Sequence, residues 1–272
     1  MTDFVSLEAL AALFEPGQSV AIPVDNAGVS MAATAALIEA GITGLKLVCV
    51  PISGLQADLL IGVRAVASLE TSAISLGEAG GAPRFTAGVR AGNFDLRDST
   101  CPAIFAGLLA AQKGVPFMPI AGIIGSDLLR VRTDWKVVDS PVGEPGQVVV
   151  VPAIAPDVAL FRAPEADRAG NVRIGRHREL ASMAYAAKRT LVTVERIVAR
   201  NLLETEDSAA GVLPSLYVDS VAVAERGAWP LSLWDEYAGD DAEVARYAAM
   251  ARTEEGFHAY LSAHLARRKQ VA

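Results

Sequence analysis

The stretch PDVALFRAPEADRAGNVRIG, residues 156–175, contains the two patterns from which the fold can be predicted. Its first half is an apolar, strand-like run, and its second half places several charges around the pair Gly170-Asn171 before alternation returns at 172–174. Gly and Asn tolerate the positive φ that tight reversals need, so we expect a hairpin-type turn at 167–171. The charges on this one bend, in a chain rich in Ala, Val and Leu, need an explanation.

Strand-like and helix-like segments alternate on both sides of this stretch. Continuous apolar runs such as LKLVCVP are typical of strands covered on both faces, and the alternation predicts an α/β protein with a mainly parallel open sheet and helices on both faces. We expect one domain over 1–272, and a long irregular loop at 121–147. The expected strands are 18–24, 45–51, 66–76, 115–120, 147–154, 157–163, 172–174 and 190–195, and the expected helices are 7–14, 30–40, 55–61, 83–92, 100–113, 179–188, 241–250 and 253–269.

Composition limits the possible functions. The 272 residues are 52% hydrophobic and 20% charged, with a net charge of −7, which indicates a globular protein and argues against nucleic-acid binding. No window of about 20 apolar residues predicts a membrane span, and no signal peptide is visible, so we expect a cytoplasmic protein. Cys49 and Cys101 are too few for a disulfide framework, and no metal-ligand spacing occurs. The high apolar content leaves an interface with another chain open.

Several familiar catalytic patterns are missing from the sequence. There is no G-x-G-x-x-G after a strand, no P-loop and no G-x-S-x-G elbow, so nucleotide binding and a self-contained hydrolase lose their usual basis. We expect His258 and His264 to lie at the surface. His177 could act in acid–base chemistry, although an exposed position beside the bend is the simpler expectation.

Two stretches remain as candidates for a site. VDNAGVS (24–30) follows the first long strand and opens a helix, a place where parallel sheets bind ligands and where backbone N–H groups can hold an anion. Asp25, Asn26, Gly28 and Ser30 are therefore candidates, with ordinary helix capping by Asn26 or Ser30 as the alternative. GIIGSD (122–127) offers Gly125 and Ser126, with a mere flexible bend as the alternative.

A third stretch, GEAGGAPRFTAG (77–88), is rich in glycine but lacks the lysine and spacing of a nucleotide loop. Gly77 and Glu78 open it at an expected strand end, so Glu78 is the best acid–base candidate in the chain. The alternative is a simple strand-to-helix turn with Pro83 at the helix start.

Taken together, several stretches resemble the A (alpha) subunit of family I CoA-transferases, particularly the glutaconate CoA-transferase branch, over nearly the whole chain. The segments that carry the resemblance are IEAGITGLKLV (38–48), ISLGEAGG (74–81), GVPFMPIAGIIGSD (114–127), PDVALFRAPEADRAGNVRIG (156–175), AAKRTLVTVERIV (186–198) and YVDSVAVAERGAWP (217–230). The resemblance implies that this turn shapes the substrate region near a partner subunit. Asp167 and Asn171 are therefore candidate substrate-binding residues, and the charges of the bend would form the polar rim of a pocket.

The resemblance also implies a ping-pong transfer of CoA between an acyl-CoA thioester and a carboxylic acid. The nucleophilic glutamate would lie on a partner B (beta) subunit, in a hetero-dimer or hetero-tetramer. CoA thioester would be the substrate, with no bound cofactor and no metal. From this chain we expect Glu78 and Asn26 to be catalytic, and we expect substrate binding by Asp25, Gly28, Ser30, Gly77, Gly125, Ser126, Asp167 and Asn171.

The chain departs from the family pattern at several positions. Where the family usually has G-G-F or G-x-G after its first strand, this chain has Pro23-Val24-Asp25-Asn26, and proline donates no N–H. Ala79 stands where asparagine is often seen, and Trp229 where histidine is common. One branch of the family, the A subunits of steroid ring-opening hydrolases, hydrolyses a C–C bond instead. Two alternatives therefore stay open: part of an acyl-CoA or C–C bond hydrolase, or a non-catalytic structural subunit.

Overall fold

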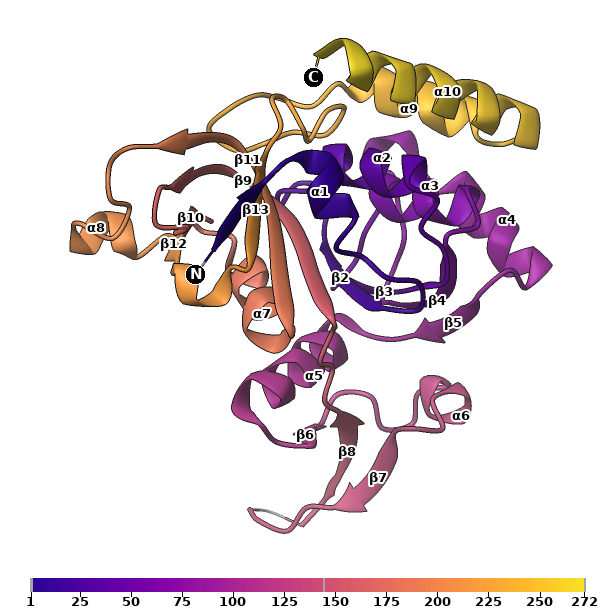
Figure 1. The fold of residues 1–272 in the computed structure, drawn as a ribbon. Helices are drawn as coiled ribbons and strands as arrows, with labels where there is room; N and C mark the ends of the chain where they lie inside the picture. Colours follow the sequence, from indigo (N-terminus) through magenta and orange to yellow (C-terminus); the bar gives the residue numbers. More distant parts are fainter. Residues whose placement is uncertain (1, 144, 272) are drawn as a thin grey trace.

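The computed structural model describes residues 2–143 and 145–271, and it is built on one large, mainly parallel sheet (Figure 1). The strand order is β1-β13-β11-β9-β2-β3-β4-β5, with parallel pairing between all neighbours. The strands are β1 (Asp3–Val5), β2 (Ser19–Pro23), β3 (Leu45–Val50), β4 (Val66–Thr71), β5 (Asp95–Asp98), β9 (Val158–Asp167), β11 (Arg189–Val198) and β13 (Ser220–Val223). The predicted fold class is confirmed.

The strand order reverses between β2 and β9. From β2 the chain adds strands in one direction, through β3 and β4 to β5, and from β9 it adds them in the other, through β11 to β13. In open α/β sheets, ligands bind at the carboxyl ends of the strands near such a reversal. Because the chain enters β2 and β9 at the middle of the sheet, both strands are deeply buried, and β9 is buried at every position.

One face of the sheet is covered by two layers of helices. The inner layer consists of α1 (Leu7–Ala11), α2 (Met31–Glu39), α3 (Leu55–Gly62) and α4 (Pro83–Ala91), and α9 (Asp241–Met250) and α10 (Glu254–Val271) lie outside it (Figure 1). A Cβ on Gly62 would overlap the ring of Phe257, so glycine lets α10 approach α3 closely. The buried Asp58 carboxylate accepts a hydrogen bond from the Tyr247 hydroxyl at 2.6 Å. The outer helices explain why α3 is buried on all sides.

The opposite face carries α5 (Cys101–Lys113) and α7 (Arg178–Ala186), which contact each other and enclose a second apolar core. Short elements complete the carboxyl edge of the sheet: β10 (Val172–Arg173) and β12 (Val212–Leu213), which pair antiparallel, η1 (Gly77–Ala79) and α8 (Glu206–Ala209). The short helix η2 (Ser215–Tyr217) leads into β13. β10 also pairs antiparallel with the end of β9, and Gly170 has φ +88, so the predicted hairpin is confirmed.

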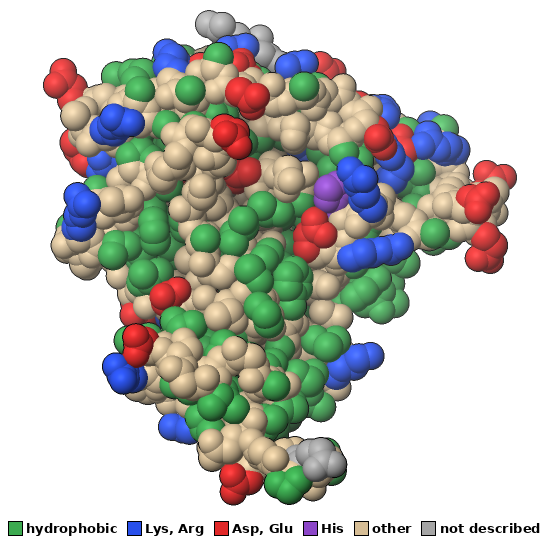
Figure 2. All heavy atoms as spheres, turned by 180° about the vertical axis from the view of Figure 1, so that it is seen from behind, with side chains coloured by type: hydrophobic (Ala, Val, Ile, Leu, Met, Phe, Trp, Pro, Cys, Tyr) green, Lys and Arg blue, Asp and Glu red, His purple; other side chains and the backbone are tan. Residues whose placement is uncertain are grey.

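A small antiparallel sheet projects from the main body, where an irregular loop was expected. It has the order β6-β8-β7, formed by β6 (Phe117–Ile120), β8 (Gln147–Pro152) and β7 (Lys136–Asp139), with α6 (Leu128–Val131) beside it (Figures 1 and 2). The strands expected at 115–120 and 147–154 are confirmed as β6 and β8. The irregular loop expected over 121–147 is interrupted by α6 and β7, and its Ile123 and Trp135 join Val149 and Val151 in a core of their own.

Other expectations need smaller corrections. β5, with the sequence DLRD, is exposed at all four positions and was missed because it has no apolar alternation. The strand expected across 66–76 ends at Thr71. His177 and His264 are largely buried instead of exposed, because His177 packs on Trp234 and His264 stacks on Trp229 and Tyr260. Among the described residues no helix is both long and apolar enough to cross a membrane.

Candidate functional site

The loops that follow β2, β3 and β4 meet at the carboxyl edge of the sheet. The Asp25 carboxylate, just after β2, accepts a hydrogen bond from the backbone N–H of Leu55 at 3.0 Å. A Cβ on Gly54 would overlap both Asp25 Oδ2 and the carbonyl oxygen of Ser75. Glycine is therefore required at position 54, and it brings residues from three successive strand ends into one cluster, here called the Asp25 cluster (Asp25, Ser53, Gly54 and Ser75).

Asp25 is the titratable group of this cluster. Its Oδ1 is buried and has no hydrogen-bond partner among the described residues, so only the other oxygen is satisfied. The pKa of Asp25 is raised to about 6, mainly by burial and to a smaller degree by the nearby Asp58 carboxylate, while the N–H groups of Leu55 and Gly54 act to lower it. A carboxyl group with this pKa is present in both protonation states near neutral pH, so it can give or take a proton.

Two neighbours of Asp25 are polar and buried but do not add a second reactive group. The Ser53 hydroxyl is buried and lacks a partner among the described residues. Cys49 lies inside β3 without exposed surface, and burial raises the pKa of its thiol to about 12. A thiol of such high pKa is not ionised at neutral pH and is a poor nucleophile.

Glu78 and Gly77 lie beside this cluster, on η1. The N–H of Gly77 donates to the Ser75 hydroxyl at 3.2 Å, and the N–H of Leu76 donates to the carbonyl of Gly80 at 2.8 Å, so the turn is tied to Ser75. The Glu78 side chain is exposed. The structure thus places Glu78 on the same edge as Asp25, three residues from Ser75, and its catalytic role stays a prediction.

The loop after β2 is held in place by β9 and β11. The Gly28 carbonyl accepts the N–H of Arg162 at 2.6 Å, and Gly28 has φ +79 with no room for a Cβ beside the Arg162 carbonyl. The buried Ser30 hydroxyl caps α2 through Ala33 and lies 2.6 Å from the Thr193 hydroxyl. Gly28 and Ser30 therefore fix the loop. Asn26 is exposed at its tip, and its predicted role is untested.

Gly125 and Ser126 belong to the projecting small sheet. The Ser126 hydroxyl accepts the N–H of Leu128 at 3.2 Å, and Gly125 has φ +82, so both residues shape the entry to α6. Nearby, Arg132 is buried, forms an ion pair with Glu70 at 2.9 Å and donates to the Asp98 carbonyl at 3.1 Å, which ties this segment to β4 and β5. Substrate binding by Gly125 and Ser126 stays a prediction.

Asp167 and Asn171 are buried within the hairpin, and their part in a polar pocket rim stays a prediction. Asp167 accepts hydrogen bonds from the N–H groups of Ala169, Asn171 and Leu202 and from the Asn171 amide. Although burial acts to raise it, these hydrogen bonds hold the pKa of Asp167 below its usual value. Both residues shape the hairpin, and their predicted contact with substrate is untested.

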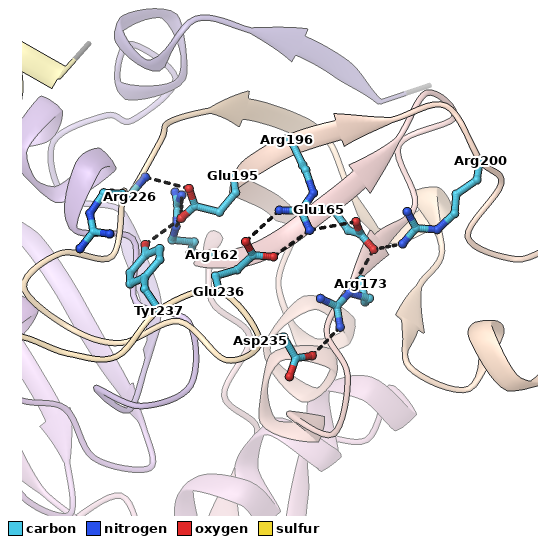
Figure 3. A network of polar contacts seen from close by, with 10 residues as sticks. All are labelled: Arg162, Glu165, Arg173, Glu195, Arg196, Arg200, Arg226, Asp235, Glu236 and Tyr237. Carbon is cyan, nitrogen blue, oxygen red and sulfur yellow. Dashed lines mark hydrogen bonds and ion pairs between the residues drawn. The ribbon is translucent and has the colours of Figure 1, made fainter.

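Three charges of the opening stretch, Arg162, Glu165 and Arg173, belong to a network of ion pairs that the sequence did not reveal (Figure 3). Arg162, fully buried on β9, pairs with Glu195 on β11 and donates to the Thr193 hydroxyl at 3.2 Å. Glu195 also accepts the Tyr237 hydroxyl and the N–H of Arg226, both at 2.7 Å. Burial is the main cause that raises the pKa of Tyr237 to about 12, so this phenol stays protonated and donates.

A second half of the network surrounds Glu165, which is 2% exposed at the end of β9. Arg173 lies 3.1 Å from it, Arg196 lies 3.4 Å away, and Arg200 completes the set. Figure 3 shows that Glu236 and Asp235, from the segment after β13, hold two of these arginines in turn. The network fixes that segment over the ends of β9 and β11. The sequence signal for these ion pairs was a charged residue at the end of an apolar strand, as in TLVTVE.

Fold and site together define an open-sheet α/β protein with a loop cluster at the carboxyl edge near the strand reversal. The chain belongs to the coenzyme A transferase family, whose model matches residues 5–224. Two of its relatives are named as A subunits of CoA-transferases, and it shares its fold with a solved glutaconate CoA-transferase.

The A subunit of the glutaconate CoA-transferase of Acidaminococcus fermentans is 30% identical over 221 residues, covering 75% of this chain and 68% of that one. The crystal structure of that enzyme superposes with a TM-score of 0.86 at 27% identity, covering 96% of this chain and 88% of that chain. The A subunit of the 3-oxoadipate CoA-transferase of Pseudomonas knackmussii is 29% identical, with 97% and 94% coverage. These relatives support transferase activity.

Relatives with other named activities share the fold. A crystal structure of a variant of the decarboxylase AibA/AibB superposes with a TM-score of 0.85 at 30% identity, covering 98% of this chain and 99% of that one. The cholesterol ring-cleaving hydrolase IpdA subunit of Rhodococcus jostii is 29% identical, with coverages of 67% and 64%. An uncharacterized protein of Archaeoglobus fulgidus is 34% identical, and the match spans about a third of its length, 34%.

Proposed function

We propose that this chain is the A subunit of a two-subunit CoA-transferase that moves CoA between an acyl-CoA thioester and a carboxylic acid. The observation that carries the proposal is the match to the A subunit of a 3-oxoadipate CoA-transferase, which covers 97% of this chain and 94% of that one. Because that relative is itself named as an A subunit, its name supports a separate B subunit as the other half of the enzyme. The nucleophilic glutamate would come from that partner.

In this proposal the Asp25 cluster forms one wall of a cleft shared with the partner. The partner's glutamate attacks the thioester carbonyl and expels CoA as its thiolate, which leaves an acyl-glutamyl anhydride. The thiolate then attacks the glutamyl carbonyl of this anhydride, so the first carboxylate departs and a glutamyl-CoA thioester forms. The second carboxylate attacks that thioester and expels the thiolate, which attacks the new acyl carbonyl to give the second acyl-CoA and the free glutamate. The oxyanion of each step needs hydrogen-bond donors. Pro23 supplies none, and the Ala27 N–H already donates to the Val24 carbonyl, so we assign this role to the exposed Asn26 amide.

The experiment is a comparison of three samples: this chain alone, a B-type chain coded beside it alone, and the co-purified pair. Each is given an acyl-CoA and a labelled carboxylic acid, and CoA exchange is followed by chromatography. We expect exchange only in the pair, with the parallel double-reciprocal plots of ping-pong kinetics. Exchange by this chain alone would contradict the proposal, because it would place the nucleophile here.

A second candidate function is C–C bond cleavage on a CoA thioester, and Asp25 is the observation that favours it. Breaking a C–C bond next to a thioester leaves an enolate that must be protonated, and a carboxyl group with a pKa of about 6 is suited to donate that proton. The two functions differ in one requirement: a transferase needs an acceptor acid, whereas a C–C cleaving enzyme turns over without one. Turnover in the absence of any acceptor acid selects the second candidate.

A further inference from the structure

The helices on the two faces of the main sheet differ in how far they are covered by other elements. On one face the inner helices are covered by α9 and α10, and α3 is buried throughout. On the other face α5 is the unusual element, because its sequence CPAIFAGLLAAQK contains a single charged residue, Lys113, at its last position. A helix that is apolar on all sides is normally buried. Yet α5 has a side facing away from the core.

That outward side is a stripe of residues spaced four apart. Cys101, Phe105 and Leu109 are exposed, and Phe105 and Leu109 expose 37% and 40% of their surface. The buried side consists of Ala103, Ile104, Gly107, Leu108 and Ala110. Because residues four apart lie on one face of a helix, the stripe is a continuous apolar ridge.

Neighbouring elements extend this ridge into a surface. The Gln112 amide of α5 donates to the Ser182 carbonyl of α7 at 3.2 Å, and Tyr185, one turn further along α7, packs against Tyr217 with the rings tilted by 59° and their centroids 4.4 Å apart. Below α5 the chain continues into β6. The α5 face, as we call this surface, consists of Phe105, Leu109, Val115, Phe117, Tyr185, Leu216 and Tyr217.

The α5 face is large for a free surface. Leu216 is 84% exposed and Phe117 is 50% exposed. With about 200 Å² for a fully exposed aromatic side chain, the seven residues present roughly 600 Å², the upper end of the largest patch on an ordinary monomer. A stable interface buries about 800 Å² on each partner. Figure 2 shows hydrophobic side chains running as a band down one side of the molecule toward the small sheet.

We propose that the α5 face is the surface on which the B subunit docks. The inference rests on the proposed function and adds to it the place of contact. We choose a B subunit over a second copy of this chain because relatives of this chain are named as A subunits of CoA-transferases, and a second copy would bring no nucleophile.

The position of α5 supports this choice of partner. The Cys101 thiol, at the start of α5, lies 3.2 Å from the Ser72 hydroxyl, which itself donates to the Pro51 carbonyl at 2.9 Å. Pro51 and Ser72 begin the two loops that lead to Gly54 and Ser75 of the Asp25 cluster. A partner chain that covers α5 therefore reaches the edge of the candidate site, where its glutamate has to act.

The test measures binding of the B-type chain coded beside this one. Phe105→Asp/Leu109→Asp places two charges on the ridge, while Val89→Asp places one on α4, on the opposite face, at a residue of similar exposure, 42%. We expect the double variant to raise the Kd for the B-type chain at least 100-fold, because two apolar anchors are replaced by charges. Val89→Asp should stay within about threefold of wild type.

Hydrogen exchange on the wild-type complex removes any dependence on the folding of the variants. Amides of residues 101–117 should gain protection when the B-type chain binds. Unchanged exchange there, or an unchanged Kd for the double variant, overturns the inference and leaves the proposed function standing if the complex still exchanges CoA. Protection of α5 by a homodimer of this chain, with the B-type chain bound elsewhere, also overturns it. No wild-type complex at all overturns both.

Discussion

Asp25 and Asp167 are the same residue type at the ends of two adjacent parallel strands, yet their surroundings are opposite. Asp167 is buried and accepts four hydrogen bonds from within and beside its hairpin. Asp25 accepts one from Leu55 and keeps a buried oxygen without a partner among the described residues. The pKa of Asp167 is lowered, whereas that of Asp25 is raised to about 6.

The difference separates a residue that stabilises the fold from one that costs stability. A buried carboxylate that accepts a full set of hydrogen bonds favours folding, and removing it leaves the hydrogen-bond donors without an acceptor. An incompletely satisfied carboxyl group at a strand reversal lowers stability, which natural proteins tolerate mainly at functional sites. Substitutions at and around these two residues test whether the two aspartates have these different roles. The expected effects on stability and activity differ widely in size.

Asp167→Ala should give the largest effect. It leaves four donors without their acceptor, and we expect a loss of about 2–4 kcal/mol in the free energy of unfolding at pH 7, measured by urea denaturation. Because the folded-state pKa of Asp167 lies below the unfolded one, its stabilisation is present above the unfolded pKa and fades as the pH falls. Arg168→Ala, on the exposed side of the same turn, should change stability by less than about 0.5 kcal/mol. Equal losses of stability in the Asp167 and Arg168 variants would contradict the structural role assigned to Asp167.

Gly54→Ala tests how tightly the Asp25 cluster is packed. The new methyl group would overlap the carboxylate of Asp25 and the carbonyl of Ser75, and we expect about 1–3 kcal/mol of destabilisation together with loss of CoA exchange in the complex. Gly81→Ala is the matched control, since a Cβ there meets nothing within 4 Å and Gly81 does not have a positive φ. A tolerated Gly54→Ala would show that the three loops do not meet as described.

Asp25→Asn should stabilise the chain at pH 7 and lower its activity. The folded-state pKa of about 6 lies above the ordinary value of 3.8, so the folded state binds more protons between those values and loses stability as the pH rises through that window. Removing the carboxyl group should therefore raise the free energy of unfolding by about 1–2 kcal/mol at pH 7, with no gain below about pH 4. Thermal unfolding of both proteins from pH 4 to pH 8 measures this, and a destabilised variant at pH 7 would contradict it.

Glu78→Gln should have the smallest effect on folding, below about 0.5 kcal/mol, because the side chain is exposed. If Glu78 has its predicted acid–base role, kcat/KM of the reconstituted complex should fall at least tenfold. A value within about twofold of wild type, worth only about 0.4 kcal/mol, would remove Glu78 from the mechanism and leave Asp25 as the proton carrier.

The sequence was sufficient for the parts of the fold that local patterns determine. The apolar runs of β3 and β9, the Ser30 cap and the Gly170 turn each follow from residue type and spacing, and the structure has them. It was not sufficient for β5 and β7, which are exposed four-residue strands whose pairing is decided by their neighbours.

The candidate site was predictable only in part. The strand-end rule placed Asp25 and Glu78 on one edge, but the overlap that requires Gly54 and the orphaned oxygen of Asp25 depend on contacts between loops far apart in sequence. Likewise, Arg162 and Glu195 are 33 residues apart, and nothing local indicates that they pair. Two charges of the opening stretch, Arg162 and Glu165, are therefore buried in ion pairs that the sequence did not indicate, whereas Arg168 on the bend is exposed.

The account depends on the attacking carboxylate belonging to another chain. The most direct measurement is the intact mass of each chain after the co-purified pair is incubated with acyl-CoA and trapped, followed by peptide mapping of any adduct. We predict a CoA thioester on a glutamate of the B-type chain and an unmodified mass for this one. A CoA adduct on this chain, at Glu78 or elsewhere, would contradict the account.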